Sequence, residues 1–119
     1  LIDTLRIIDL ENKKSLIAKQ LSHGEKQWLE IGMLLMQQPE LLLIDEPVAG
    51  MTEKETRSTA NLLKKISNDR TVLVVEHDMD FVESLNVEIV VLHDGGVLTR
   101  GTMKEVKTNQ QVIDVYLGR

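Results

Sequence analysis

Residues 41–47 read Leu-Leu-Leu-Ile-Asp-Glu-Pro, and this stretch decides the predicted fold. Four consecutive apolar residues lead directly into two carboxylates and a proline. A short apolar run of this kind is typical of a strand buried on both faces of a parallel sheet. Pro47 cannot donate a backbone hydrogen bond and disfavours helix at Glu46, so we expect the strand to end there.

The two carboxylates at the end of this strand, Asp45 and Glu46, predict a ligand site. Ligands of open α/β sheets bind at the carboxyl ends of the strands. Two acids beside a dry core are costly unless they are paired, protonated or bound to a metal. Mg²⁺ with a nucleotide phosphate would remove that cost, with Asp45 in the Mg²⁺ shell and Glu46 orienting a water. The stretch alone also fits a strand that simply ends in solvated acids.

Composition excludes several classes of protein. The 119 residues contain 14 Lys and Arg against 19 Asp and Glu, and the net charge of −5 argues against a protein that binds nucleic acid by neutralising phosphates. The absence of cysteine excludes disulfides and thiolate metal sites. No apolar run approaches the ~18 residues that a membrane-spanning helix needs.

The chain begins with Leu1 inside a helix-like pattern, so we expect a segment upstream of it.

Apolar periodicity and helix caps predict the amino-terminal third. Residues 1–10 have the pattern of a helix, and residues 11–20 form a polar connector. Ser22 and Glu25 have the spacing of a capping box, which should open a helix that runs to about Gln37.

The same signals predict a helix after the central strand. Thr52 and Glu55 repeat the capping-box spacing and begin a helix to about Ile66. Its inward-facing residues should be Ala60, Leu62, Leu63 and Ile66.

A second β-branched run, residues 71–75, also ends in polar residues, and Asp78 should cap a helix over 79–85. Asp94-Gly95-Gly96 between two apolar stretches predicts a hairpin. Strand, helix, strand, helix and hairpin predict an α/β domain with a mainly parallel sheet, flanking helices and an antiparallel hairpin near the end. Thr102 and Asn109 should begin two further short helices, the second with a tail through Gly118.

Three stretches, in their order and spacing, resemble the ATP-binding subunits of ATP-binding cassette (ABC) transporters. Leu21-Ser22-His23-Gly24-Glu25 is similar to the family signature, usually Leu-Ser-Gly-Gly-Gln. Residues 41–45 resemble the Walker B strand, and Glu46 stands at the position of the catalytic glutamate. Residues 49–52 fall at the D-loop, and His77 matches the switch histidine.

The resemblance implies a P-loop NTPase-type fold. Residues 1–40 would form part of a helical subdomain that carries the signature. Residues 41–119 would form the carboxyl-terminal part of the catalytic core, with Walker B, D-loop, switch histidine, terminal hairpin and helices.

The resemblance also implies roles for the site residues and cofactors ATP and Mg²⁺. Glu46 would polarise the attacking water, His77 would contact the γ-phosphate, and Asp45 would hold Mg²⁺, commonly through a water. A helix that begins with a hydroxyl and free amides suits a terminal phosphate. In the family that phosphate belongs to ATP held mainly by the partner subunit, and the signature residues here are Leu21, Ser22, His23, Gly24 and Glu25.

Some residues depart from the family pattern or have an ordinary structural interpretation. His23 replaces a glycine and is interpreted as tolerated variation; Glu25 replaces a glutamine and adds a negative charge near a phosphate site. Thr52 stands where many members have aspartate. His77 alone would also fit a hydrogen-bonded histidine at a strand end, and Trp28 is interpreted as a packing residue.

No glycine in the sequence is followed by lysine, so a Gly-x-x-x-x-Gly-Lys-Ser/Thr loop is absent from it. We therefore expect the chain to be the carboxyl-terminal half of an ATPase subunit that neither binds ATP well nor hydrolyses it alone.

Within the family, the chain is most similar to subunits of branched-chain amino-acid and urea importers, and closest to the urea branch. The implied partners are a second ATP-binding subunit, transmembrane permease subunits and, indirectly, a solute-binding protein, with no nucleic acid. The implied location is cytoplasmic, on the inner face of the membrane. Two alternatives remain open: a soluble non-transport ATPase of the same superfamily, acting in DNA repair or translation, and an inert structural or interaction piece.

Overall fold

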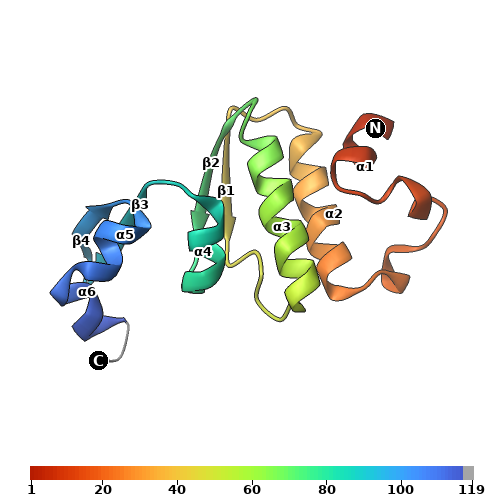
Figure 1. Ribbon diagram of the computed structural model, residues 1–119. Helices are drawn as coiled ribbons and strands as arrows, with labels where there is room; N and C mark the ends of the chain where they lie inside the picture. The colour runs from red at the N-terminus through yellow and green to blue at the C-terminus, as the bar shows by residue number, and fades with distance from the viewer. Residues whose placement is uncertain (117–119) are drawn as a thin grey trace. The chain divides into compact units, whose positions relative to one another are not determined.

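The computed structural model describes residues 1–116, which form two compact units that divide between His77 and Asp78 (Figure 1). The first contains α1 (Ile2–Ile7), the 3₁₀ helices η1 (Glu11–Lys13) and η2 (Ala18–Gln20), α2 (His23–Leu35), β1 (Leu41–Asp45), α3 (Glu53–Ile66) and β2 (Thr71–Val75). The second contains α4 (Met79–Leu85), β3 (Ile89–His93), β4 (Gly96–Gly101), α5 (Met103–Thr108) and α6 (Gln110–Val115). The predicted α/β class is confirmed.

Strands β1 and β2 pair in parallel and are joined through α3. Their register runs from Leu41 opposite Thr71 to Asp45 opposite Val75, and the Glu46 N–H donates to the Val75 carbonyl at 2.8 Å. The carboxyl ends of the two strands therefore meet at one edge, as expected for parallel strands.

Burial on the parallel pair differs from the prediction for β1. Leu42 and Ile44 are buried, but Leu41 and Leu43 are 52% and 64% exposed, so burial on both faces was wrong for the described residues. On β2, Leu73 and Val75 are exposed as well. Side chains alternate between the faces of a strand, so these four residues give the pair one apolar face open to solvent.

Helices α2 and α3 lie side by side in the first unit (Figure 1). The predicted inward residues of α3 are confirmed as buried, and the indole Nε1 of Trp28 on α2 donates to Oγ1 of Thr59 on α3 at 2.8 Å. Trp28 therefore contributes to packing, as predicted. Ile31 and Leu35 of α2 are buried in the same unit.

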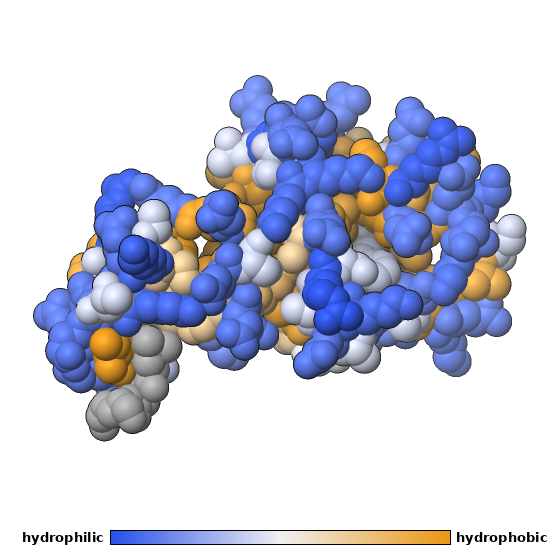
Figure 2. All heavy atoms as spheres, in the orientation of Figure 1, coloured by the Kyte–Doolittle hydropathy of each residue, from blue (hydrophilic) through white to orange (hydrophobic). Residues whose placement is uncertain are grey.

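The first helix is shorter than the periodicity predicts. Helix α1 ends at Ile7, and Asp9 has a left-handed backbone with φ 59°. A left-handed residue cannot continue a right-handed helix. The predicted connector contains the two short 3₁₀ helices. Hydrophobic residues reach the surface around α1 and the connector among hydrophilic ones, as Figure 2 shows; Leu1, Leu16 and Ile17 are among the exposed ones.

The hairpin and the caps of the second unit follow the sequence. Strands β3 and β4 pair antiparallel as a separate two-stranded sheet. Asp94 and Gly95 both have positive φ, 48° and 77°, which is the backbone of a type I′ turn. The predicted caps Asp78, Thr102 and Asn109 each accept a backbone hydrogen bond at a helix start. The predicted tail at residues 117–118 lies outside the described residues.

Candidate functional site

The carboxyl edge of the parallel pair brings together two of the predicted catalytic residues. Glu46 follows β1 and His77 follows β2, and Oε1 of Glu46 lies 3.2 Å from Nδ1 of His77. The His77 N–H also donates to Oε1 of Glu76 at 3.0 Å. The side chains of Glu46 and His77 are 51% and 74% exposed, so both are open to a ligand. An exposed carboxylate beside an imidazole can hold a water and exchange a proton with it.

Asp45 occupies the last position of β1, beside this pair in the sequence, and is exposed. Within residues 1–116, no group of three or more His, Asp or Glu side chains is arranged to hold a metal ion. Mg²⁺ commonly takes one or two carboxylates and completes its octahedron with waters and substrate phosphates. The single exposed carboxylate of Asp45 is therefore suited to bind Mg²⁺ only when a nucleotide supplies further ligands to the ion.

The segment after Glu46 turns sharply. Glu46 has a left-handed backbone with φ 47°, although it is neither glycine nor asparagine. Side chains with a Cβ rarely adopt this conformation, and such strain is concentrated at functional sites. Gly50 has φ 74°, and the loop between them reaches α2, because Nε2 of His23 lies 2.9 Å from the carbonyl oxygen of Ala49.

The predicted signature residues surround the start of α2. Ser22 is the N-cap: its Oγ accepts from the Glu25 N–H at 3.1 Å, and Oε1 of Glu25 accepts from the Ser22 N–H at 2.9 Å. The predicted capping box is therefore confirmed. Lys13 forms an ion pair with Glu25, and the Lys13 ammonium, followed by the Ser22 amide, lowers the pKa of Glu25. Leu21 is half-buried and its N–H donates to the Ala18 carbonyl at 3.1 Å.

A residue that the sequence did not place in this site, Glu55, joins the signature to α3. Its Oε1 accepts from the N–H and hydroxyl of Thr52, each at 3.2 Å. Its Oε2 accepts from the Ser22 hydroxyl and the Gly24 N–H, each at 3.1 Å. The Thr52 amide first, then the Ser22 hydroxyl and the other donors, lower the pKa of Glu55.

The ring of His23, which was interpreted as tolerated variation, contacts the Ala49 carbonyl oxygen. The capping-box spacing identified Glu55 on its own helix, but no local signal points to its second contact. That contact depends on α2 and α3 lying with their first turns together.

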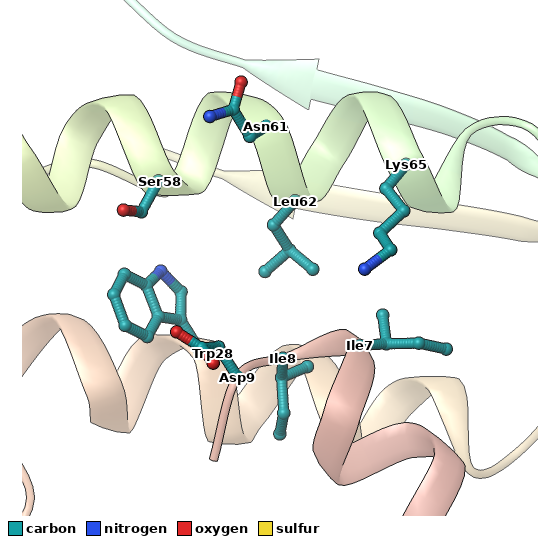
Figure 3. A pocket seen from close by; sticks show the side chains of 8 residues that line it. All are labelled: Ile7, Ile8, Asp9, Trp28, Ser58, Asn61, Leu62 and Lys65. Atoms are coloured by element: carbon teal, nitrogen blue, oxygen red, sulfur yellow. The ribbon is translucent and has the colours of Figure 1, made fainter. Parts of the chain in front are cut away.

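A separate hollow of about 220 Å³ lies between α3 and the α1–α2 side of the first unit (Figure 3). Trp28, Ile8 and Asp9 line it from one side, and Leu62 and Lys65 of α3 from the other. None of the predicted catalytic, signature or metal residues lines it. The site therefore consists of exposed groups at the strand edge and the start of α2.

Comparison with known proteins shows which family this chain is similar to. The family model described as "ABC transporter" matches residues 1–49. "High-affinity branched-chain amino acid transport ATP-binding protein LivG" of Salmonella typhimurium is 39% identical over 103 residues, which cover 85% of this chain and 40% of that protein. This chain belongs to the ABC transporter family. The predicted family is thereby confirmed.

Two further relatives are also named as ATP-binding or transport proteins. The branched-chain amino acid transport protein BraF of Pseudomonas aeruginosa is 40% identical over 103 residues, covering 85% of this chain and 40% of that protein. "Methionine import ATP-binding protein MetN 1" of Bacillus cereus is 37% identical over 109 residues, covering 90% of this chain and 32% of that protein.

The solved structure titled "ADP conformation of MJ1267, an ATP-binding cassette of an ABC transporter" superimposes with a TM-score of 0.88 at 27% identity, over 99% of this chain and 48% of that one. The predicted ABC ATPase fold is thereby confirmed. The chain spans about 40% of the length of the branched-chain amino-acid relatives.

No helix within residues 1–116 is both long and apolar enough to cross a lipid bilayer.

Proposed function

We propose that this chain carries the signature and Walker B parts of the ATP-hydrolysing subunit of an ABC importer, which couples ATP hydrolysis to uptake of a small solute. The observation that carries the proposal is the 3.2 Å pair of Glu46 and His77 at the carboxyl edge of two parallel strands. In parallel α/β sheets this edge is where ligands bind.

The two members of the pair have different roles. Glu46 accepts a hydrogen bond from the attacking water and draws its proton, which makes the water a better nucleophile. His77, 3.2 Å away, orients the Glu46 carboxylate through Nδ1 and contacts the γ-phosphate. Asp45 would hold Mg²⁺ through a water, and the ion would neutralise charge on the phosphates.

The start of α2 supplies the other half of a phosphate site. The Ser22 hydroxyl and the Gly24 N–H are donors at a helix amino terminus, where the helix dipole favours an anion. We assign them, with Leu21, His23 and Glu25, to the terminal phosphate of ATP bound by a second ATP-binding subunit. The chain would therefore act in a dimer, with permease subunits and, indirectly, a solute-binding protein.

The organisation follows from these roles. Residues 1–40 belong to a helical subdomain, and residues 41–119 to the catalytic core. Because the sequence has no Gly-x-x-x-x-Gly-Lys loop, the 119 residues alone should not bind ATP tightly or hydrolyse it. Transport subunits of this kind work at the cytoplasmic, inner face of the membrane.

The solute is proposed as a branched-chain amino acid or urea. The names of LivG and BraF favour amino acids. Trp28, Gly50-Met51-Thr52 and residues 91–95 instead resemble the subunits of urea importers, which favours urea. Uptake of labelled leucine and of labelled urea in cells that lack the subunit decides between them. If only leucine uptake is lost, urea is excluded as the solute. If only urea uptake is lost, branched-chain amino acids are excluded.

The hydrolytic role is tested in the complete subunit with Glu46→Gln. We expect kcat to fall by about 100-fold or more while ATP still binds, because the general base is lost and the shape is kept. Glu53→Gln is the control, since it removes one charge from a side chain that is 98% exposed. Full ATPase activity in Glu46→Gln would refute the assignment.

A further inference from the structure

One carboxylate, that of Glu55, is shared by the first turns of two helices. Its Oε1 binds Thr52 at the start of α3, and its Oε2 binds the Ser22 hydroxyl and the Gly24 N–H at the start of α2. The fit to α2 is close, because a Cβ on residue 24 would lie 2.7 Å from Cδ of Glu55. Glycine at this position thus makes room for the carboxylate.

The two donors on α2 are those that the proposed function assigns to a nucleotide phosphate. A carboxylate and a phosphate are both anionic acceptors, and both are suited to donors at a helix start. They also repel each other, so they cannot occupy these donors together. Either Glu55 or a phosphate holds Ser22 and Gly24 at one time.

We propose, on the basis of the function proposed above, that Glu55 holds the Ser22 hydroxyl and the Gly24 N–H in the absence of nucleotide and must release both before a phosphate binds there. Glu55 is then a positioning residue that sets how strongly the signature binds phosphate. A glutamate is ionised at neutral pH and so competes with phosphate for these donors, and the hydrogen bonds that Glu55 accepts lower its pKa further.

The division of contacts between the two oxygens makes release possible without loss of α3. Rotation of the carboxylate can withdraw Oε2 from α2 while the other oxygen keeps the Thr52 N–H. The Oγ1 of Thr52 still accepts from the Glu55 N–H at 3.1 Å, so the helix cap remains. The contact of His23 with the Ala49 carbonyl keeps the neighbouring loop on α2 during the exchange.

The variant Glu55→Gln separates these functions. Its amide oxygen can still accept from Thr52, but its NH₂ group then faces the Gly24 N–H, a donor against a donor. Glu53→Gln is the matched control, because it removes the same charge from the same helical turn. The Glu53 side chain is 98% exposed, and its carboxylate lies 4.0 Å from the guanidinium of Arg57.

The test is a titration of the ¹⁵N-labelled 119-residue chain with inorganic phosphate at pH 7 and constant ionic strength, followed by NMR. The Gly24 amide reports binding. In Glu55→Gln we expect the dissociation constant for phosphate to fall by about three- to tenfold, since exposed charge-assisted contacts are weakened by water. A purely structural role for Glu55 would weaken binding instead.

In the wild-type chain, the Glu55 side-chain ¹³C signal should move with the same dissociation constant as the Gly24 amide, a measurement that does not depend on the variant folding. The proposal is overturned if that signal stays fixed while the Gly24 amide saturates. It is also overturned if Glu55→Gln matches Glu53→Gln or binds phosphate more weakly than wild type. Equal binding by all three chains leaves the phosphate site intact and removes the role of Glu55. Absence of binding in all three removes the phosphate site and, with it, the role of Glu55.

Discussion

The hydroxyl of Thr59 links α3 to α2 from a fully buried position, and its removal should weaken the unit that carries the site. Oγ1 accepts from Nε1 of Trp28 at 2.8 Å and donates to the Glu55 carbonyl at 2.8 Å. Thr59→Val keeps the shape of the side chain and removes both bonds. The Trp28 N–H then loses its acceptor in a half-buried setting.

We expect Thr59→Val to lower the free energy of unfolding by about 1–2 kcal/mol, since a net hydrogen bond contributes about 1 kcal/mol and an orphaned donor somewhat more. Trp28 is the only tryptophan of the chain, so its fluorescence during urea unfolding reports on the first unit. With an m-value of about 1.5 kcal/mol/M, the midpoint should fall by about 1 M.

A double-mutant cycle with Trp28→Phe, followed by circular dichroism, isolates the hydrogen bond between these two side chains. The double variant should lose about 1 kcal/mol less than the sum of the single variants. Ser58→Ala, at the exposed neighbouring position, should stay within about 0.5 kcal/mol of wild type. An unchanged midpoint in Thr59→Val, or single effects that add fully, would refute the reasoning.

Two further predictions concern the turn of the hairpin and the acid side of the signature. Gly95→Ala should destabilise the chain by about 1 kcal/mol in urea unfolding, because φ is 77°. Apart from the neighbouring residues of the chain, no atom lies within 4 Å of the added Cβ, so the cost comes from backbone strain and not from a clash. Gly95→Asn should cost less, and an equal loss in both would contradict this cause. Lys13→Ala should raise the pKa of Glu25 toward 4.5, measured from its ¹³C carboxyl signal. The stabilisation by ionised Glu25 is fully present above pH 4.5 and is lost as the pH falls through the lowered pKa of Glu25. The Lys13→Ala variant should therefore lose less folding stability on acidification than the wild-type chain. An unchanged pKa of Glu25 in this variant would contradict the role of Lys13.

The features that sequence predicted are local. Capping boxes such as Ser22 with Glu25 need only residues three apart, and the turn at Asp94-Gly95 needs only residues that tolerate positive φ. The meeting of Glu46 and His77 was also predictable, because parallel strands bring their carboxyl ends to one edge.

The features that sequence missed depend on packing or on one backbone angle. The left-handed Asp9 ends α1 early, which an apolar pattern does not reveal. The exposure of Leu41 and Leu43 depends on whether another layer covers β1, and an apolar run predicts only that the side chains suit a buried face. The contacts of Glu55 with α2 require two helices to start side by side, across 31 residues of chain.

The proposed division of the ATP site is tested most directly by calorimetric titration of this 119-residue chain with MgATP, beside the complete subunit that contains it. Binding by the complete subunit alone is predicted, since Asp45, Glu46, His77 and the signature supply only part of a site and the sequence lacks the Gly-x-x-x-x-Gly-Lys loop. Tight binding of MgATP by the 119-residue chain would contradict it.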